Sequence, residues 1–218
     1  MDNKHWHDRW ADDRIGFHQT EINPYLVPFW PVLEQTPGSR VFVPLSGKSL
    51  DMLWLADQGH QVFGIEISDI AVEAFFTENN LRYERETRGR FEVYRSAELE
   101  LWCGDFFDLT PEHLAGVSAV FDRASLVAFP AELRGNYAGH LQRLLPREAA
   151  ILLVTLEYPE HEMQGPPFPV RTAEVNRLFG DRYRVELLES LEILDQEPHF
   201  RKKGLSTLME RIYHLRAA

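Results

Sequence analysis

The chain has 218 residues, 44% of them hydrophobic, and a formal net charge of −11, which suits one globular domain. The acidic balance argues against a nucleic-acid partner, because binding to a phosphate backbone draws on basic patches. No apolar run approaches the roughly 20 residues of a membrane-spanning helix and the first residues are too polar for a secretion signal, so we expect a cytoplasmic protein that binds a small molecule.

The first 38 residues are rich in aromatic side chains, and we expect them to form a helical lid. Trp6 and Trp10 are four residues apart and therefore share one face of a helix. This pair either pins the terminus onto the body of the protein or covers a cationic or planar ligand with an indole face. A second helix is predicted to open at Asn23-Pro24.

The segment from Arg40 to Ser68 reads as strand, turn, helix, turn and strand. Val41 to Val43 are apolar and β-prone, the next turn contains Gly47, and the second strand ends in Glu66. An acidic residue at the tip of a second parallel strand, about 20 residues beyond a glycine turn, can accept hydrogen bonds from both ribose hydroxyls of a nucleoside. The alternative is that Glu66 only ends a surface strand.

Two phosphate-binding patterns fail at this turn. Gly47-Lys48-Ser49 resembles the end of a P-loop, but the glycine required five places earlier is replaced by Phe42. A dinucleotide fold needs G-x-G-x-x-G, and the turn has one glycine. The pattern therefore favours a nucleoside without a phosphate chain, and S-adenosylmethionine is such a ligand.

Two further strand ends carry polar side chains. Asp105 follows the strand Leu99 to Cys103 and precedes Phe106. Its carboxylate could accept a hydrogen bond from the amine of a base while an aromatic ring packs on the base face. The alternative is that Asp105 caps a turn. Asp122 and Arg123 end the strand that starts at Val117. In an open α/β sheet ligands bind at such ends, so Arg123 could hold a carboxylate, or the two residues could pair locally.

The order of elements predicts the fold class. Helices alternate with strands up to residue 155, whereas 182–194 and 208–215 read as an antiparallel hairpin, with 81–90 and 195–204 as polar loops. We expect a three-layer, Rossmann-like α/β domain spanning residues 1–218, with a mostly parallel seven-stranded sheet and the hairpin at one edge. The single cysteine, Cys103, and the scattered histidines offer no metal-ligand spacing, so no metal is expected.

Several strings resemble the thiopurine S-methyltransferase family almost from end to end. They are W-x3-W-x6-FHQ (6–19), VPLSGKSLDMLWLADQGHQVFGIEIS (43–68), FFTENNL (75–81), WCGDFFDL (102–109), FDRASLVA (121–128), LEYPEHEMQGPPFPV (156–170) and ExxRLFG (174–180). The resemblance implies a class I methyltransferase fold. It also implies transfer of the methyl group of S-adenosylmethionine to aromatic and heterocyclic thiols such as 6-mercaptopurine, a detoxification chemistry.

Carried over by position, the resemblance implies a set of site residues. Phe17 matches a residue that lines the acceptor pocket, and Ser46 stands where the family commonly has cysteine. In the loop 197–204 an acceptor-facing arginine of the animal enzymes could match Pro198, His199 or Arg201. The implied cofactor contacts are Trp10, Leu45, Glu66, Asp105, Phe106 and Arg123.

Methyl transfer from a sulfonium to a thiol is an in-line displacement in which positioning supplies most of the acceleration. Asp122, Arg123 or water is expected to take any proton, although aromatic thiols ionise readily and make a dedicated base optional. Alternatives are another acceptor, including selenium or tellurium compounds, and a protein that binds the cofactor without catalysis. We expect a monomer.

Overall fold

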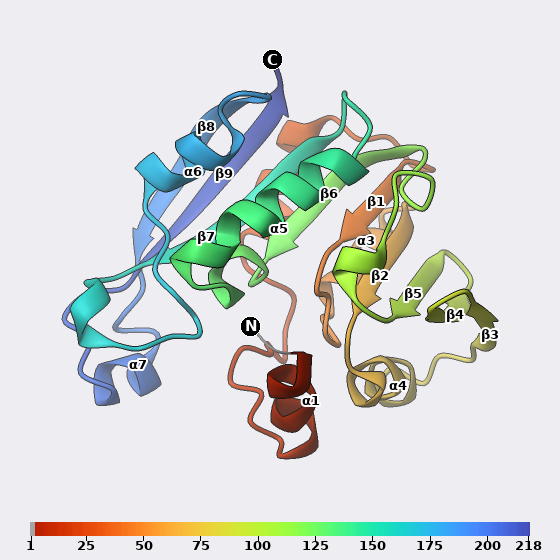
Figure 1. Cartoon of the computed structure of the whole chain (residues 1–218), viewed down its shortest axis with the longest axis horizontal. Coiled ribbons are helices and arrows are strands. Elements are labelled where there is room, and N and C mark those ends of the chain that lie inside the picture. The colour runs from red at the N-terminus through yellow and green to blue at the C-terminus, as the bar shows by residue number, and fades with distance from the viewer. Residues whose placement is uncertain (1–2) are drawn as a thin grey trace.

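The computed structural model describes residues 3–218, which form one nine-stranded sheet in the order β3-β4-β5-β2-β1-β6-β7-β9-β8 (Figure 1). The strands are β1 (Arg40–Val43), β2 (Gln61–Glu66), β3 (Glu84–Arg88), β4 (Phe91–Ser96), β5 (Leu99–Cys103), β6 (Val117–Arg123), β7 (Ala150–Glu157), β8 (Tyr183–Glu192) and β9 (Met209–Ala217).

The centre of the sheet is parallel and both sides of it are antiparallel. Strands β5, β2, β1, β6 and β7 run in parallel, while β4 and β3 on one side and β9 and β8 on the other are antiparallel. The edge hairpin β8-β9 confirms the prediction. The sheet has nine strands where seven were predicted. One of the additional strands is β3, which lies within residues 81–90, a segment expected to be only a polar loop.

Strand β3 escaped prediction because it has no buried face. All five of its residues, ERETR, are exposed, so the alternation of apolar and polar residues that marks a half-buried strand is missing. Its charged side chains bond instead to neighbouring charges: Arg85 Nε lies 3.0 Å from Glu92 and Arg88 Nε lies 2.6 Å from Glu86. Backbone pairing with β4 and these ion pairs hold the strand in place.

Helices cover both faces of the sheet. They are α1 (Asn3–Ala11), α2 (Leu26–Phe29), α3 (Asp51–Asp57), α4 (Asp69–Glu78), α5 (Ala131–Leu144), α6 (Thr172–Phe179) and α7 (Pro198–Lys202), with 3-10 turns η1 (Trp30–Leu33), η2 (Phe106–Asp108), η3 (Leu126–Ala128) and η4 (Glu160–Glu162). The expected second helix begins at Leu26 and passes into η1, because Pro28 and Pro31 lack the N–H that an α-helix needs. The short helix α7 lies within the predicted loop 195–204.

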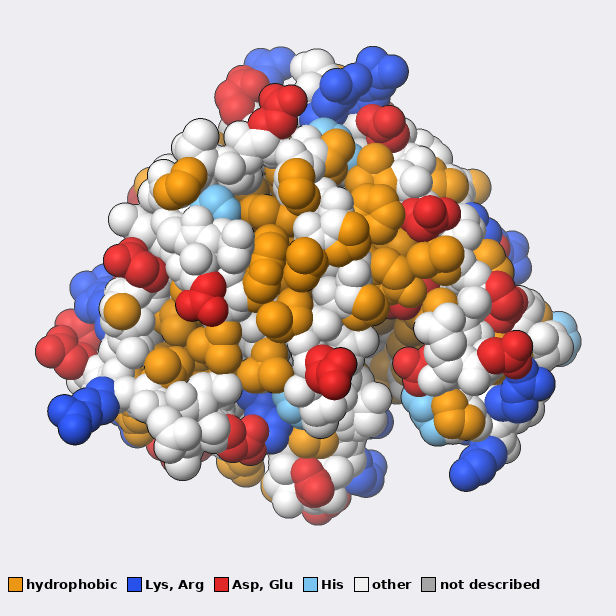
Figure 2. All heavy atoms as spheres, turned by 180° about the vertical axis from the view of Figure 1, so that it is seen from behind, with side chains coloured by type: hydrophobic (Ala, Val, Ile, Leu, Met, Phe, Trp, Pro, Cys, Tyr) orange, Lys and Arg blue, Asp and Glu red, His pale blue; other side chains and the backbone are white. Residues whose placement is uncertain are grey.

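The sheet divides the core into two layers, because successive side chains of a strand point to opposite faces of the sheet. Phe42 of β1 packs in a cluster with α5 and α6, whereas its neighbours Val41 and Val43 pack in a second cluster with α2, α3 and α4. Figure 1 shows α5 and α6 on the near face, and Figure 2, seen from behind, shows hydrophobic side chains gathered over the middle of the opposite face. The three-layer prediction is thereby confirmed.

Helix α1 lies apart from both layers, below the end of the sheet where the parallel strands finish (Figure 1). Ser68 caps α4 by accepting a hydrogen bond from the Ala71 N–H at 3.4 Å, which turns the chain sharply after Glu66. Within residues 3–218, no helix has the length and apolar character needed to cross a membrane. The space between α1 and the strand ends holds the candidate site.

Candidate active site

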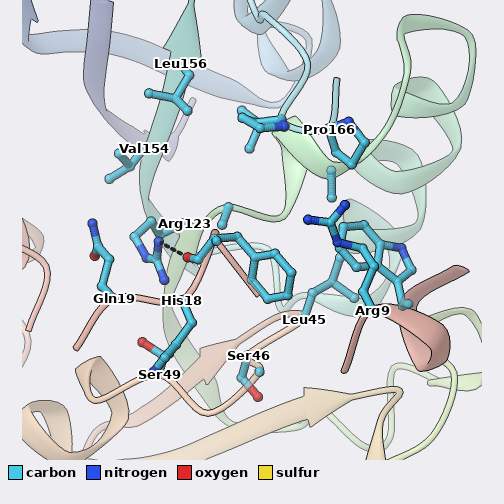
Figure 3. A pocket seen from close by; sticks show the side chains of 18 of the residues that line it. Arg9, His18, Gln19, Leu45, Ser46, Ser49, Arg123, Val154, Leu156 and Pro166 are labelled. Atoms are coloured by element: carbon cyan, nitrogen blue, oxygen red, sulfur yellow. Dashed lines mark hydrogen bonds between the residues drawn. The ribbon is translucent and has the colours of Figure 1, made fainter. Parts of the chain in front are cut away.

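A cavity of about 480 Å³ opens at the carboxyl ends of β1, β2, β6 and β7. Its walls come from α1 and the loop after it, the turn after β1, the ends of these strands, η2, η3, α7 and β9. Such a volume suits a small ligand, and the end of a parallel sheet is where α/β folds bind one. Figure 3 shows side chains from the two halves of the chain turned toward one another across this space.

Glu66 lies on the cavity wall at the tip of β2 and is only 5% exposed. One carboxylate oxygen accepts the Gly47 N–H and the other the Ser68 N–H, both at 2.9 Å. Burial raises the pKa of Glu66, against these backbone bonds and a Trp10 side-chain bond that lower it. The alternative of a surface acid is wrong: this carboxylate is buried, oriented and aimed at a cavity.

The turn after β1 brings backbone close to α1. Leu45 has a φ of 45° and Gly47 a φ of 53°, and a Cβ added at Gly47 would lie 3.1 Å from the Trp10 ring. A positive φ is uncommon for a residue with a side chain. It projects Leu45 onto the cavity wall, so the residue that strand and turn reasoning alone would not select is held there by backbone conformation.

The aromatic residues of the first 19 residues form one wall of the cavity. The Phe17 ring meets Trp10 edge to face at 5.5 Å and Trp6 at 5.6 Å. Trp10 is 6% exposed. The burial of Trp10 supports the anchoring role, and both tryptophans line the cavity with Phe17. That an indole face covers a ligand stays a prediction.

Asp105 and Phe106 line the cavity beneath α1. One Asp105 carboxylate oxygen caps η2 by accepting the Phe107 N–H at 2.8 Å, and the other accepts the Asn3 side-chain amide at 2.8 Å. The capping alternative is thus confirmed for one oxygen, without removing Asp105 from the wall. Phe106 is fixed by packing on Tyr137 at 5.1 Å.

Arg123, at the end of β6, projects into the cavity (Figure 3). Its Nη1 donates to the Phe17 carbonyl at 3.4 Å, and its Nε lies 3.5 Å from the carboxylate of Asp51, a residue of α3 that is 2% exposed. The local pairing of Arg123 with Asp122 is wrong, because adjacent strand residues point to opposite faces. One guanidinium thus joins β6, α3 and the loop after α1.

Asp122 points away from the cavity, into the layer of α5. It is fully buried and accepts the Tyr137 hydroxyl at 2.7 Å, and it is absent from the residues that line the cavity. Burial raises its pKa to about 6, with the Tyr137 bond opposing the rise. The structure does not bring Asp122 to the place where an acceptor would sit.

The loop expected at 197–204 contributes α7 to the wall. His199 lines the cavity, with its Nδ1 3.1 Å from Glu197. Arg201 turns away and pairs with Asp195, and Pro198 only starts the helix. Of the three residues that could match an acceptor-facing arginine, the structure therefore places His199 on the cavity wall.

Sequence reasoning missed several charged wall residues, Asp51, Glu197 and Lys203 among them, and two more come from α1 and β9. Arg9 of α1 lies over Phe17, with its guanidinium carbon 5.6 Å from the ring centroid, and its buried Nε has no hydrogen-bond partner within residues 3–218. Burial lowers its pKa. Glu210 of β9 is the second. The only available signal for Arg9 was its position next to Trp10 on a helix; for Glu210 the sequence offers none.

These residues fit S-adenosylmethionine. Glu66 retains lone pairs for ribose hydroxyls, since a carboxylate has about four acceptor sites. The guanidinium cations of Arg9 and Arg123 suit the carboxylate of the amino-acid part, and the aromatic wall suits a sulfonium. No group of three or more His, Cys, Asp or Glu side chains within residues 3–218 is arranged to hold a metal ion.

The family model described as Thiopurine S-methyltransferase (TPMT) matches residues 1–218. The chain belongs to this family. A thiopurine S-methyltransferase of Nitrosospira multiformis is 50% identical over 215 residues, covering 99% of this chain and 98% of the relative. That of Methylococcus capsulatus is 50% identical over 218 residues, covering 100% and 98%. The family resemblance is thereby confirmed along the whole chain.

Solved structures of distant proteins share the fold. A Burkholderia thailandensis 1,6-didemethyltoxoflavin-N1-methyltransferase with bound S-adenosylhomocysteine superposes with a TM-score of 0.65 at 13% identity, covering 99% of this chain and 87% of that one. An arsenic(III) S-adenosylmethionine methyltransferase of Chlamydomonas reinhardtii gives 0.61 at 14% identity, covering 84% and 64%. These likenesses confirm the class I methyltransferase fold.

Proposed function

We infer that this chain is an S-adenosylmethionine-dependent methyltransferase that methylates the sulfur of aromatic and heterocyclic thiols, thiopurines among them. The observation that carries the inference is the buried Glu66 carboxylate, fixed by two backbone bonds at the edge of a cavity that Arg123 and an aromatic wall complete. Family membership over residues 1–218 supports the acceptor class.

We propose a division of the wall between two ligands. Trp10, Leu45, Glu66, Asp105, Phe106 and Arg123 contact the cofactor, and Arg9, which lines the same cavity, joins them. Phe17 contacts the acceptor, supported by its place between Arg9 and Arg123. Residues 1–38 act as a lid, which is supported by the position of α1 below the strand ends (Figure 1).

The bound cofactor supplies an electrophilic methyl group on a sulfonium. The protein holds the two reactants in line, which supplies most of the acceleration when a good leaving group meets a strong nucleophile. The Trp6-Trp10-Phe17 wall excludes water and faces the cationic region. The cation of Arg123 stabilises an anionic acceptor sulfur in the cavity. The ion pair with Asp51 fixes the orientation of the Arg123 side chain.

We further propose a monomer that works in the cytoplasm and binds no nucleic acid. The net charge of −11 supports the last point. Selenium and tellurium compounds are the second acceptor class: Arg9 and Arg123 give the cavity two cations suited to an oxyanion. A protein that binds the cofactor without catalysis is the remaining alternative.

The test is a calorimetric titration with S-adenosylhomocysteine, followed by methyl-transfer assays on 6-mercaptopurine and on selenite. We expect binding, and turnover of the thiol. Binding with turnover of selenite alone would move the acceptor class, binding without any turnover would favour the non-catalytic alternative, and absence of binding would overturn the assignment of Glu66.

A further inference from the structure

A second acid, Glu210, lies on the cavity wall away from the strand that carries Glu66. In the antiparallel pair β7-β9 it stands directly opposite Leu156. Directly opposed residues project to the same face of a sheet, and both line the cavity. Glu210 thus reaches the site from the edge hairpin, through a strand that carries none of the cofactor residues.

Three titratable or charged side chains from other parts of the chain affect Glu210. The Tyr25 hydroxyl and Arg123 of β6 favour its charged form, and Glu197 before α7 repels it. Burial raises the pKa of Glu210 to about 7, while Tyr25 and Arg123 lower it. Behind these groups, His199 pairs with Glu197 at 3.1 Å and Asp51 pairs with Arg123 at 3.5 Å.

Two acids of the cavity wall interact with the charge of Arg123, and Asp51 is the one that forms an ion pair with it within residues 3–218. Asp51 is fixed by further bonds, since it accepts from the Asn23 N–H and the Ser49 hydroxyl, both at 2.7 Å. Glu210 lines the cavity and forms no ion pair within residues 3–218, and Tyr25 is its one hydroxyl neighbour. Of the other acids on the wall, Glu66 is bonded to backbone, Asp105 caps η2 and Glu197 pairs with His199, so Glu210 is the wall acid best placed to exchange a proton.

We propose that Glu210 accepts the proton that the methyl acceptor loses, and that it thereby selects thiols and thiones of nitrogen heterocycles, which carry that proton when they bind. This rests on the proposed function. The S–H or ring N–H bond breaks toward a Glu210 oxygen, and an electron pair of the acceptor sulfur forms the new bond to the methyl carbon. The bond between the methyl carbon and the sulfonium sulfur breaks, and its electron pair stays on the departing thioether sulfur. The electron pair of the S–H or N–H bond stays on the acceptor, and the proton passes from Glu210 to water.

The test compares two acceptors in the Glu210→Gln variant. For 6-mercaptopurine, which binds with a proton, we expect kcat/KM to fall about 100-fold, as loss of a general base does. For 5-thio-2-nitrobenzoate, whose electron-poor ring keeps its sulfur ionised at neutral pH, we expect an unchanged or higher value, because no proton has to be removed and a like charge is gone. Equal losses for both acceptors would overturn the proposal.

The pH profile provides a second readout that a purely structural role would not move. With 6-mercaptopurine, kcat/KM of the wild type should rise through about pH 7 as Glu210 loses its proton, and E210Q should lose that rise. Tyr25→Phe removes an interaction that lowers the pKa of Glu210. The rise of kcat/KM in this variant should therefore move to higher pH. The ionisation of the acceptor itself is the same for all variants. A pH profile of Y25F equal to that of the wild type would therefore contradict the role of Glu210 as proton acceptor, even if E210Q did not fold.

The matched control is Glu186→Gln, which removes an exposed charge from β8 and should leave both acceptors and the profile unchanged. Affinity for S-adenosylhomocysteine, measured by calorimetry, should be the same in E210Q and the wild type. A wild type that turns over neither acceptor would overturn the proposed function and this role with it, whereas a wild type active on both with parallel losses in E210Q would overturn this role alone.

Discussion

The two halves of the cavity differ in how completely their polar groups are bonded. On the β1-β2-β5 side, which we call the cofactor half, Glu66 and Asp105 are each held by two hydrogen bonds within the protein. On the side of β7, β9 and α7, which we call the acceptor half, Glu210 forms no ion pair within residues 3–218 and is repelled by Glu197. The cofactor half is preorganised for one ligand, while the acceptor half keeps a group whose protonation can change.

The strongest way to break the cofactor half is Glu66→Ala. It removes the acceptor of two backbone N–H groups and, in the proposed role, of the ribose hydroxyls, and hydrogen bonds to a charged group contribute roughly 1.5 to 3 kcal/mol each. We expect the affinity for S-adenosylhomocysteine to fall at least about 100-fold by calorimetry. Glu84→Ala, on exposed β3, is the control. An unchanged Kd in a folded variant would remove Glu66 from the site.

Arg123 lies where the two halves meet, so its loss should damage both. Arg123→Ala leaves the buried Asp51 without its cation, and removal of one partner from a buried pair typically costs several kcal/mol. We expect kcat/KM with 6-mercaptopurine to fall on the order of 100-fold. Arg123→Lys keeps the charge and should retain part of the activity. Wild-type kinetics in the alanine variant would contradict the assignment.

Arg9 tests whether the lid adds a charge to the cofactor half. Arg9→Met keeps an apolar side chain over Phe17 but removes the cation with the unpartnered Nε, so we expect affinity for S-adenosylhomocysteine to fall about 10-fold. Arg14→Met, an exposed arginine paired with Asp12, should have no effect. If both variants bind alike, Arg9 serves the lid's packing only.

Asp122→Asn should have the smallest effect on activity, within about twofold, because Asp122 lies behind the wall. Its effect should be on stability. Burial raises the folded pKa of Asp122 to about 6, so the wild type loses stability as pH rises through about 4 to 6, where the unfolded carboxyl is already ionised, and the asparagine variant does not.

Urea unfolding at pH 4 and pH 8 measures this difference. The stability of the variant relative to the wild type should increase over that range by up to about 3 kcal/mol, since each unit of pKa shift corresponds to about 1.4 kcal/mol. An opposite sign would mean that Asp122 is stabilised as an anion, and a large loss of turnover would return it to the catalytic residues.

The cofactor half could be predicted from the sequence because its residues stand at strand ends. Glu66, Asp105 and Arg123 each follow a short apolar run, and parallel strands bring such ends together. The same alternation that places Phe121 and Arg123 on one face places Asp122 on the other. That signal was present in the sequence and would have excluded Asp122 from the cavity.

The acceptor half could not be predicted in the same way. Glu210 reaches the cavity only because β9 inserts between β7 and β8, an arrangement set by tertiary packing. Helix α7 has five residues, too few for a helical period to show. The conformation of this short helix decides that His199, and not Arg201, lines the cavity. The family alignment alone therefore left open which residue of the loop faces the acceptor.

The charged edge strand β3 has a consequence for the protein in concentrated solution. An outer strand offers unpaired backbone groups to which another chain can add, which is a route to aggregation. Here that edge carries ERETR, five exposed polar side chains interlocked with charges on β4. A second chain that docked on it would have to desolvate these charges. The edge that lacked any apolar signal is thus the one that protects the sheet from extending into its neighbours.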